Sequence, residues 1–198
     1  MAQTMMFTTP NYGWTNFNYL SYCNQDYTLT NPIPNEAKKY VSLSSRFRAS
    51  YLTDIPKDMY RFLTSVLLQA IRNNEAEIKT PIFEECSFDA EGWEWKIRVC
   101  MNRIFLVIKA DVIYPDKYSD VKFENEIPDF IIPIGIKIEN FVDGWINTIK
   151  NDIDSWAMWE YWNETNYKAE INERKEKLRK QIDLLKATNV LYKKWRKG

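Results

Sequence analysis

Two β-strands and the turn between them are predicted by the stretch WEWKIRVCMNRIFLVIKADV, residues 93–112. Apolar and polar residues alternate over 93–101, as they do in a strand with one buried face. Asn102 and Arg103 predict a two-residue turn, and the alternation resumes over 104–112. If the turn sets the register, the apolar face holds three facing pairs: Val99 with Leu106, Ile97 with Ile108 and Trp95 with Ala110.

The segments on either side extend this hairpin into a larger unit. Residues 82–88 predict a strand before it, and residues 130–138 predict a strand after it. The second of these contains Pro133, which cannot donate a hydrogen bond to a neighbouring strand, so we expect it at the sheet edge. An amphipathic helix is predicted from its N-cap at Asp54 to about Asn73.

Two further helices are predicted towards the C-terminus. One starts at Asn140 as N-cap and reaches about Trp162, and the other follows Asn163. The fold class is therefore α+β: a small antiparallel β meander packed with helices, an irregular N-terminal arm and a long C-terminal amphipathic helix. We expect an arm over 1–35, a core domain over 36–162 and a basic helix over 163–198.

The N-terminal arm is rich in aromatic residues and almost uncharged. Its 35 residues contain no lysine or arginine and one acid, Asp26. Such a segment is costly to leave in water, so we expect it to lie over its own domain or over a neighbouring subunit. The residues predicted to bind a partner are Phe7, Tyr12, Trp14, Phe17, Tyr19 and Tyr22.

The C-terminal helix carries an apolar stripe and most of the positive charge. Residues 164–198 have a net charge of +6, which leaves −6 on residues 1–163, because the total is zero. We expect the two parts to attract each other between subunits. The stripe predicted to pack on another helix and to bind a partner consists of Ile171, Leu178, Ile182 and Leu185.

The end of this helix holds a cluster of cations around a tryptophan. The predicted contact residues are Lys193, Lys194, Trp195 and Arg196. Lysine and arginine bind phosphates and an indole stacks on bases, so nucleic acid is one predicted partner. The favoured interpretation is that these cations complement the helix dipole and keep the terminus soluble.

Composition removes several classes of site. The chain has no histidine, five glycines without a nucleotide-binding spacing, and three widely separated cysteines. We therefore expect no cofactor, no metal site and no catalytic residue, with the cysteines as buried free thiols. No signal peptide or membrane span is apparent, so we expect no membrane partner and a location in the cytoplasm of a host cell or in a virion.

One short motif points to an enzyme instead. Glu94-Trp95-Lys96 resembles the (D/E)xK element of the PD-(D/E)xK nucleases. The resemblance implies a Mg²⁺-dependent nuclease in which Asp89 or Glu85 supplies a further acid. It covers a fragment of the chain, and the Pro-Asp pair of that family is missing at the corresponding place. Alternating charge on the outer face of a strand explains the motif as well.

The expected function is therefore non-enzymatic binding of protein. Two end segments suited to contacts, with no catalytic set between them, are typical of an assembly subunit. Richness in Asn, Ile, Lys and Tyr indicates an AT-rich genome, and we expect a minor structural protein of a bacteriophage particle. The alternatives are a phage-encoded inhibitor of a host defence enzyme, of the anti-CRISPR type, and the Mg²⁺-dependent nuclease.

Overall fold

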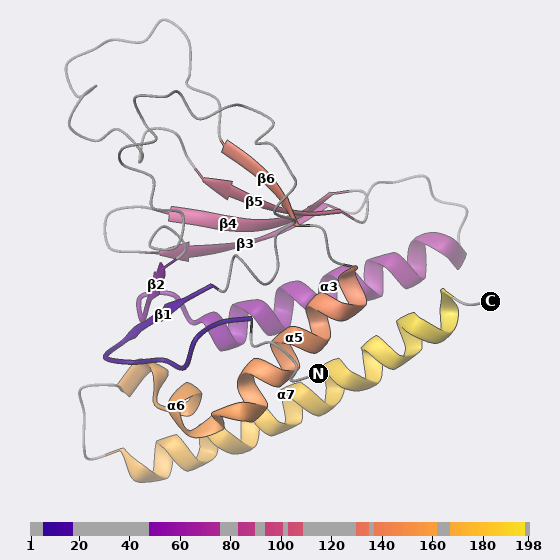
Figure 1. Cartoon of the computed structure of the whole chain (residues 1–198). Coiled ribbons are helices and arrows are strands. Elements are labelled where there is room, and N and C mark those ends of the chain that lie inside the picture. Colours follow the sequence, from indigo (N-terminus) through magenta and orange to yellow (C-terminus); the bar gives the residue numbers. More distant parts are fainter. Residues whose placement is uncertain are drawn as a thin grey trace, which may run out of the picture.

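The computed structural model describes residues 6–17, 48–75, 83–89, 94–100, 103–108, 130–134, 137–161 and 167–196. It has two antiparallel sheets and a layer of helices, which confirms the α+β prediction (Figure 1). The elements in chain order are β1 (Trp14–Asn16), β2 (Arg48–Ser50), α3 (Ile55–Glu75), β3 (Phe83–Asp89), β4 (Glu94–Cys100), β5 (Arg103–Ile108), β6 (Phe130–Ile134), α5 (Ile138–Asn151), α6 (Ile153–Ala157), the 3₁₀ helix η2 (Trp159–Tyr161) and α7 (Lys168–Trp195).

The larger sheet is a meander in the order β3-β4-β5-β6, with every neighbouring pair antiparallel. β6 contains Pro133 and lies at the edge, as predicted. The predicted register of the central hairpin is wrong by two residues, because Cys100 pairs with Arg103. The observed facing pairs are Val99 with Ile104, Ile97 with Leu106 and Trp95 with Ile108. A shift of two residues keeps each side chain on the same face, so the alternation alone does not distinguish the two registers.

Helix α3 forms as predicted. The carboxylate of Asp54 accepts a hydrogen bond from the Lys57 backbone N–H at 3.4 Å, which satisfies one of the free N–H groups of the first turn. The apolar stripe points inward and is buried at Met59, Leu63, Val66, Leu67 and Ala70. Figure 1 shows α3 beneath the four-stranded sheet, and it contacts β3 and α7.

The predicted single helix over 140–162 is wrong in two respects. Helix α5 begins at Ile138, with Lys137 rather than Asn140 in the N-cap position, and it ends at Asn151. Asp152 leaves the helical conformation, and its carboxylate accepts hydrogen bonds from the Ser155 N–H at 3.2 Å and the Ser155 hydroxyl at 2.8 Å. An aspartate that bonds to nearby groups in this way competes with the helix, so it starts the short α6 instead.

The N-terminal segment is the largest departure from expectation. The described residues 6–17 form a hairpin instead of an irregular arm, and β1 of this hairpin pairs with β2. Phe7 is 0% exposed and Phe17 is buried, and both pack against Trp95 of the sheet. The Thr148 hydroxyl of α5 accepts a hydrogen bond from the Met6 N–H at 2.6 Å. These residues cover their own domain, which is one of the two predicted positions.

Helix α7 lies along α3, α5 and α6. Its stripe is buried at Leu178, Ile182 and Leu185 and half-buried at Ile171, which confirms packing against other helices. Those helices belong to the same chain. A single hydrophobic cluster therefore contains side chains of the hairpin, the sheet, α3, α5 and α7.

Candidate functional site

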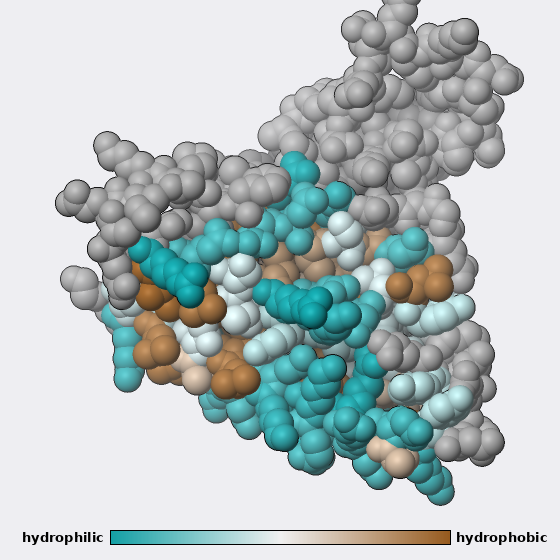
Figure 2. Space-filling model, turned by 180° about the vertical axis from the view of Figure 1, so that it is seen from behind, coloured by the Kyte–Doolittle hydropathy of each residue, from teal (hydrophilic) through white to brown (hydrophobic). Residues whose placement is uncertain are grey.

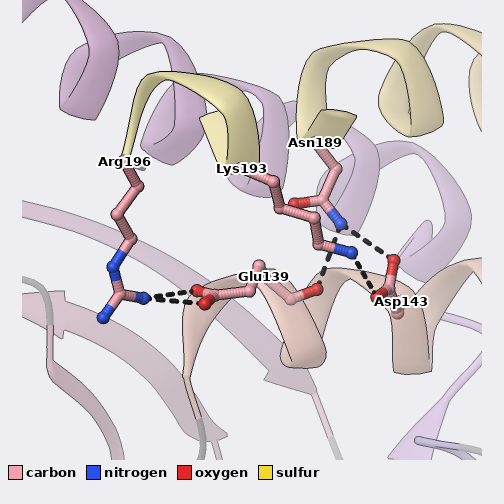
Figure 3. A network of polar contacts seen from close by, with 5 residues as sticks. All are labelled: Glu139, Asp143, Asn189, Lys193 and Arg196. Atoms are coloured by element: carbon pink, nitrogen blue, oxygen red, sulfur yellow. Dashed lines mark hydrogen bonds and ion pairs between the residues drawn. The ribbon is translucent and has the colours of Figure 1, made fainter. Parts of the chain in front are cut away.

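The basic end of α7 is engaged with α5 through a network of polar contacts (Figure 3). Lys193 Nζ lies 2.7 Å from Asp143 Oδ2, and Arg196 Nη1 lies 2.7 and 2.9 Å from the two Glu139 carboxylate oxygens. Two of the four residues predicted as partner contacts are therefore paired within the chain. Lys194 is exposed, and Trp195 is half-buried with its ring 5.6 Å from that of Tyr192.

Three members of the network in Figure 3, Glu139, Asp143 and Asn189, were not among the predicted contact residues, and Asn189 is the buried one. It is 1% exposed, and its amide donates to the Glu139 carbonyl at 3.0 Å and to Asp143 Oδ1 at 2.8 Å. Its position was visible in the sequence, four residues after Leu185 and three before Tyr192, on the buried stripe. A buried polar residue in an apolar seam restricts the register in which two helices pack. The network thus fixes how α7 lies on α5.

The positive charge of the C-terminal segment is also used in contacts within the chain. Four cations along α7 pair with acids from earlier in the chain: Arg174 with Asp54 at 3.0 Å, Lys175 with Asp154 at 2.8 Å, Lys193 with Asp143 and Arg196 with Glu139. We expected this attraction between subunits, but here it acts within one chain. The stripe and these cations hold α7 in place, so a surface for a partner has to be sought elsewhere.

The tip of the N-terminal hairpin is one such surface. Asn11 and Trp14 exchange two backbone hydrogen bonds of 2.9 and 3.0 Å around the central residues Tyr12 and Gly13. Both central residues have positive φ, 47° and 73°, which is the type I′ geometry. The Gly13 carbonyl accepts from the Tyr51 N–H at 2.9 Å. We call Tyr12, Tyr51 and Leu52 the hairpin tip.

The hairpin tip is strongly exposed. Tyr12 is 75% exposed, Leu52 is 60% exposed and Tyr51 is also exposed, whereas Trp14 is half-buried. Of the six aromatics predicted to bind a partner, Phe7 and Phe17 are core residues, and Tyr19 and Tyr22 lie outside the described residues. Among the described aromatics of this set, Tyr12 is therefore the most exposed. The positive φ that distinguishes Tyr12 could not be predicted from the sequence.

The outer face of the sheet carries Lys96 of the nuclease-like motif. Glu85 on β3 pairs with Lys96 at 3.0 Å and with Arg98 at 3.1 Å, both on β4. Hydrogen bonding from Lys96 is the main cause that lowers the pKa of Glu85. The lysine of the motif thus neutralises one of the acids proposed to hold metal. The Glu94 side chain lies outside the described residues.

Other chemical features of the described residues are consistent with structural roles. Cys86 is a buried free thiol, as predicted, and burial raises its pKa, which keeps it protonated and unreactive. A cavity of about 10 Å³ between α3, α5 and α7 has room for one water molecule. No cluster of three or more His, Cys, Asp or Glu side chains suited to a metal ion is found in the part of the chain that the structure describes.

Among the described helices, none combines the length and the apolar character needed to cross a membrane. The chain matches no protein-family model, no curated protein and no solved structure.

Proposed function

We propose that this protein is a non-enzymatic assembly subunit and that the hairpin tip is a site where it contacts another protein. The observation that carries the proposal is Tyr12, an aromatic side chain that is 75% exposed at φ 47°. The hairpin beneath it is fixed, because Phe7 and Phe17 are buried in the core. Tyr12 is therefore presented to solvent on a rigid support.

The backbone at Tyr12 is costly for the residue that occupies it. A left-handed conformation disfavours residues with a Cβ by about 1–2 kcal/mol, and asparagine or glycine is the usual choice at this position of a type I′ turn. Strained positions of this kind cluster at functional sites. Tyrosine is enriched among the residues that dominate binding at protein interfaces. A contact role for the phenol ring accounts for a tyrosine at this position.

The assembly that we propose is a bacteriophage particle, with this chain as a minor structural protein of the virion. The support for this part is the composition, rich in Asn, Ile, Lys and Tyr. The protein would be present in the cytoplasm of the infected host and in the particle.

The substitution Tyr12→Asn separates stability from binding. Asparagine accepts positive φ more readily, so we expect the free energy of unfolding to rise by about 0.5–1 kcal/mol. We expect the proteins that copurify with the wild-type chain from its native source to be lost. Thr9→Ala, at an exposed position of the same hairpin, should retain them. A Tyr12→Asn protein with the full set of copurifying proteins would contradict the contact site.

A nuclease assay tests the non-enzymatic part of the proposal. We expect purified protein with Mg²⁺ or Mn²⁺ to leave single- and double-stranded DNA and RNA intact. Cleavage that disappears in Glu94→Gln or Lys96→Ala would favour the nuclease alternative, because those residues would hold the metal and the attacking water.

A further inference from the structure

A second exposed apolar surface runs along the outer side of α3 and α7. Leu184 and Leu191 on α7 are each 59% exposed, and Leu68 on α3 is also exposed. Figure 2 shows apolar side chains gathered on the left, over the halves of α3 and α7 that lie at the right of Figure 1. We call Leu68, Leu184 and Leu191 the α3–α7 patch.

The two leucines of α7 have the spacing of a helix-binding seam. They are seven residues apart, which places them on one face, and Thr188 lies between them on that face. The Thr188 hydroxyl donates to the Leu184 carbonyl at 2.9 Å, so it is satisfied within the helix. Trp195, half-buried and four residues after Leu191, extends the row. This face is separate from the stripe of Leu178, Ile182 and Leu185 that holds α7 on its own domain.

In the described parts of α3 and α7, cations outnumber acids beside the α3–α7 patch. One exposed acid, Asp183, lies next to Leu184. Residues three or four positions from its leucines along their own helices include three charged side chains, the exposed cations Arg72, Lys180 and Lys194. In the described part of the chain, none of the three has an ion-pair partner. Lys193 and Arg196 at the end of α7, by contrast, are paired with acids of α5.

From this surface we infer that the α3–α7 patch binds an amphipathic helix of another protein, with apolar residues on one face and carboxylates along its edges. Such a helix would place its apolar side chains on the leucines and its acids against the surrounding cations. A second copy of this chain would bring like charges together, and this disfavours self-association through the patch. This inference rests on the proposed function and adds a second contact site with a defined partner chemistry.

A designed pair of peptides tests the charge part of the inference. The probe is a fluorescein-labelled helical peptide of about five turns, with leucine at i, i+4, i+7 and i+11 and glutamate at its edges. Its control has lysine in place of glutamate. We expect fluorescence anisotropy to show binding of the acidic peptide at least about tenfold tighter than that of the basic one, and weakening with added salt.

Variants of the protein test whether the acidic peptide binds at the α3–α7 patch. The double variant Leu184→Ala/Leu191→Ala should weaken the acidic peptide about tenfold or more, because two exposed anchors are lost without a change in the core. Val190→Ala, at an exposed apolar position on another face of α7, should bind as the wild type does. Tyr12→Asn should also bind normally, since the hairpin tip is not involved.

Several results would overturn the inference. The first is that neither peptide binds or that both bind equally, and the second is that the double variant keeps the wild-type affinity. The third is a dimer in sedimentation that Leu191→Ala dissociates. The fourth is that the protein binds anionic lipid vesicles but not the acidic peptide, and that the double variant loses the vesicle binding. If the peptide does not bind but Tyr12→Asn still loses its copurifying proteins, the assembly function stands and the patch alone is contradicted.

Discussion

The hairpin of residues 6–17 and helix α7 use their apolar side chains in opposite ways. The hairpin inserts Phe7 and Phe17 into the centre of the core and leaves Tyr12 in water at its tip. Helix α7 lies on the outside, buries one stripe and keeps a second apolar row exposed at Leu184 and Leu191.

Their polar anchoring differs as well. The hairpin has no ionisable side chain besides Tyr12, and the backbone N–H groups of Met6 and Phe7 donate to a buried threonine of α5. Helix α7 is held by ion pairs along its length. The comparison shows that an end segment rich in apolar residues can be an integral part of its own core. The residues available to bind a partner are then those that remain exposed after the core has formed.

Phe7→Ala gives the largest expected effect and tests whether the hairpin belongs to the core. We expect a loss of about 3–5 kcal/mol in the free energy of unfolding, because a fully buried ring is replaced by a cavity. Denaturant unfolding measures it. Tyr12→Ala, in the same hairpin but exposed, should stay within about 0.5 kcal/mol of the wild type. Equal effects of the two substitutions would show that the hairpin is not docked through Phe7.

A matched pair of leucines tests the two faces of α7. Leu178→Ala should cost about 2–3 kcal/mol, since the side chain is buried against α3 and α5. Leu184→Ala should change stability by no more than about 0.5 kcal/mol, because its side chain is largely in water. Thermal unfolding of both variants measures the two effects. A large loss in Leu184→Ala would mean that the exposed face is part of the core.

The polar network of Figure 3 should contribute less than either apolar contact. Asp143→Ala removes an acceptor for Asn189 and for Lys193, and we expect a loss of about 1–2 kcal/mol in the free energy of unfolding. Asp154→Ala breaks the more exposed pair with Lys175 and should cost no more than about 0.5 kcal/mol. A larger effect of the second substitution would contradict the network around Asn189 as the anchor of α7.

A smaller effect than that of Asp143→Ala is expected at Glu85, which lies outside both regions and gives the baseline for an exposed ion pair. Its pKa is lowered by Lys96 from the ordinary value of 4.5, so the native state favours the ionised form. Its contribution is present above that value and is lost as the pH falls through the lowered pKa. Solvent screening keeps the contribution below about 1 kcal/mol. The stability difference between wild type and Glu85→Gln should therefore shrink when the pH is lowered from 7 to about 3, and a constant difference would contradict it.

The sequence by itself determined the local elements. The alternation around Trp95, the stripe around Leu63 and the stripe around Leu178 each predicted the right type of structure, because these periods depend on residues two to four positions apart. Pro133 likewise placed β6 at the sheet edge, since a missing donor is a property of one residue.

The tertiary structure decided which surfaces those elements meet. The sequence did not show that Phe7 would lie among β4 and α5, that Asn189 would bond to α5, or that Tyr12 would adopt positive φ. Each depends on groups far away in the chain or on a turn fixed by the strands around it. The sequence lists the same apolar and charged residues whether they pack against their own domain or bind another protein. Only the packed structure shows which of these residues remain exposed.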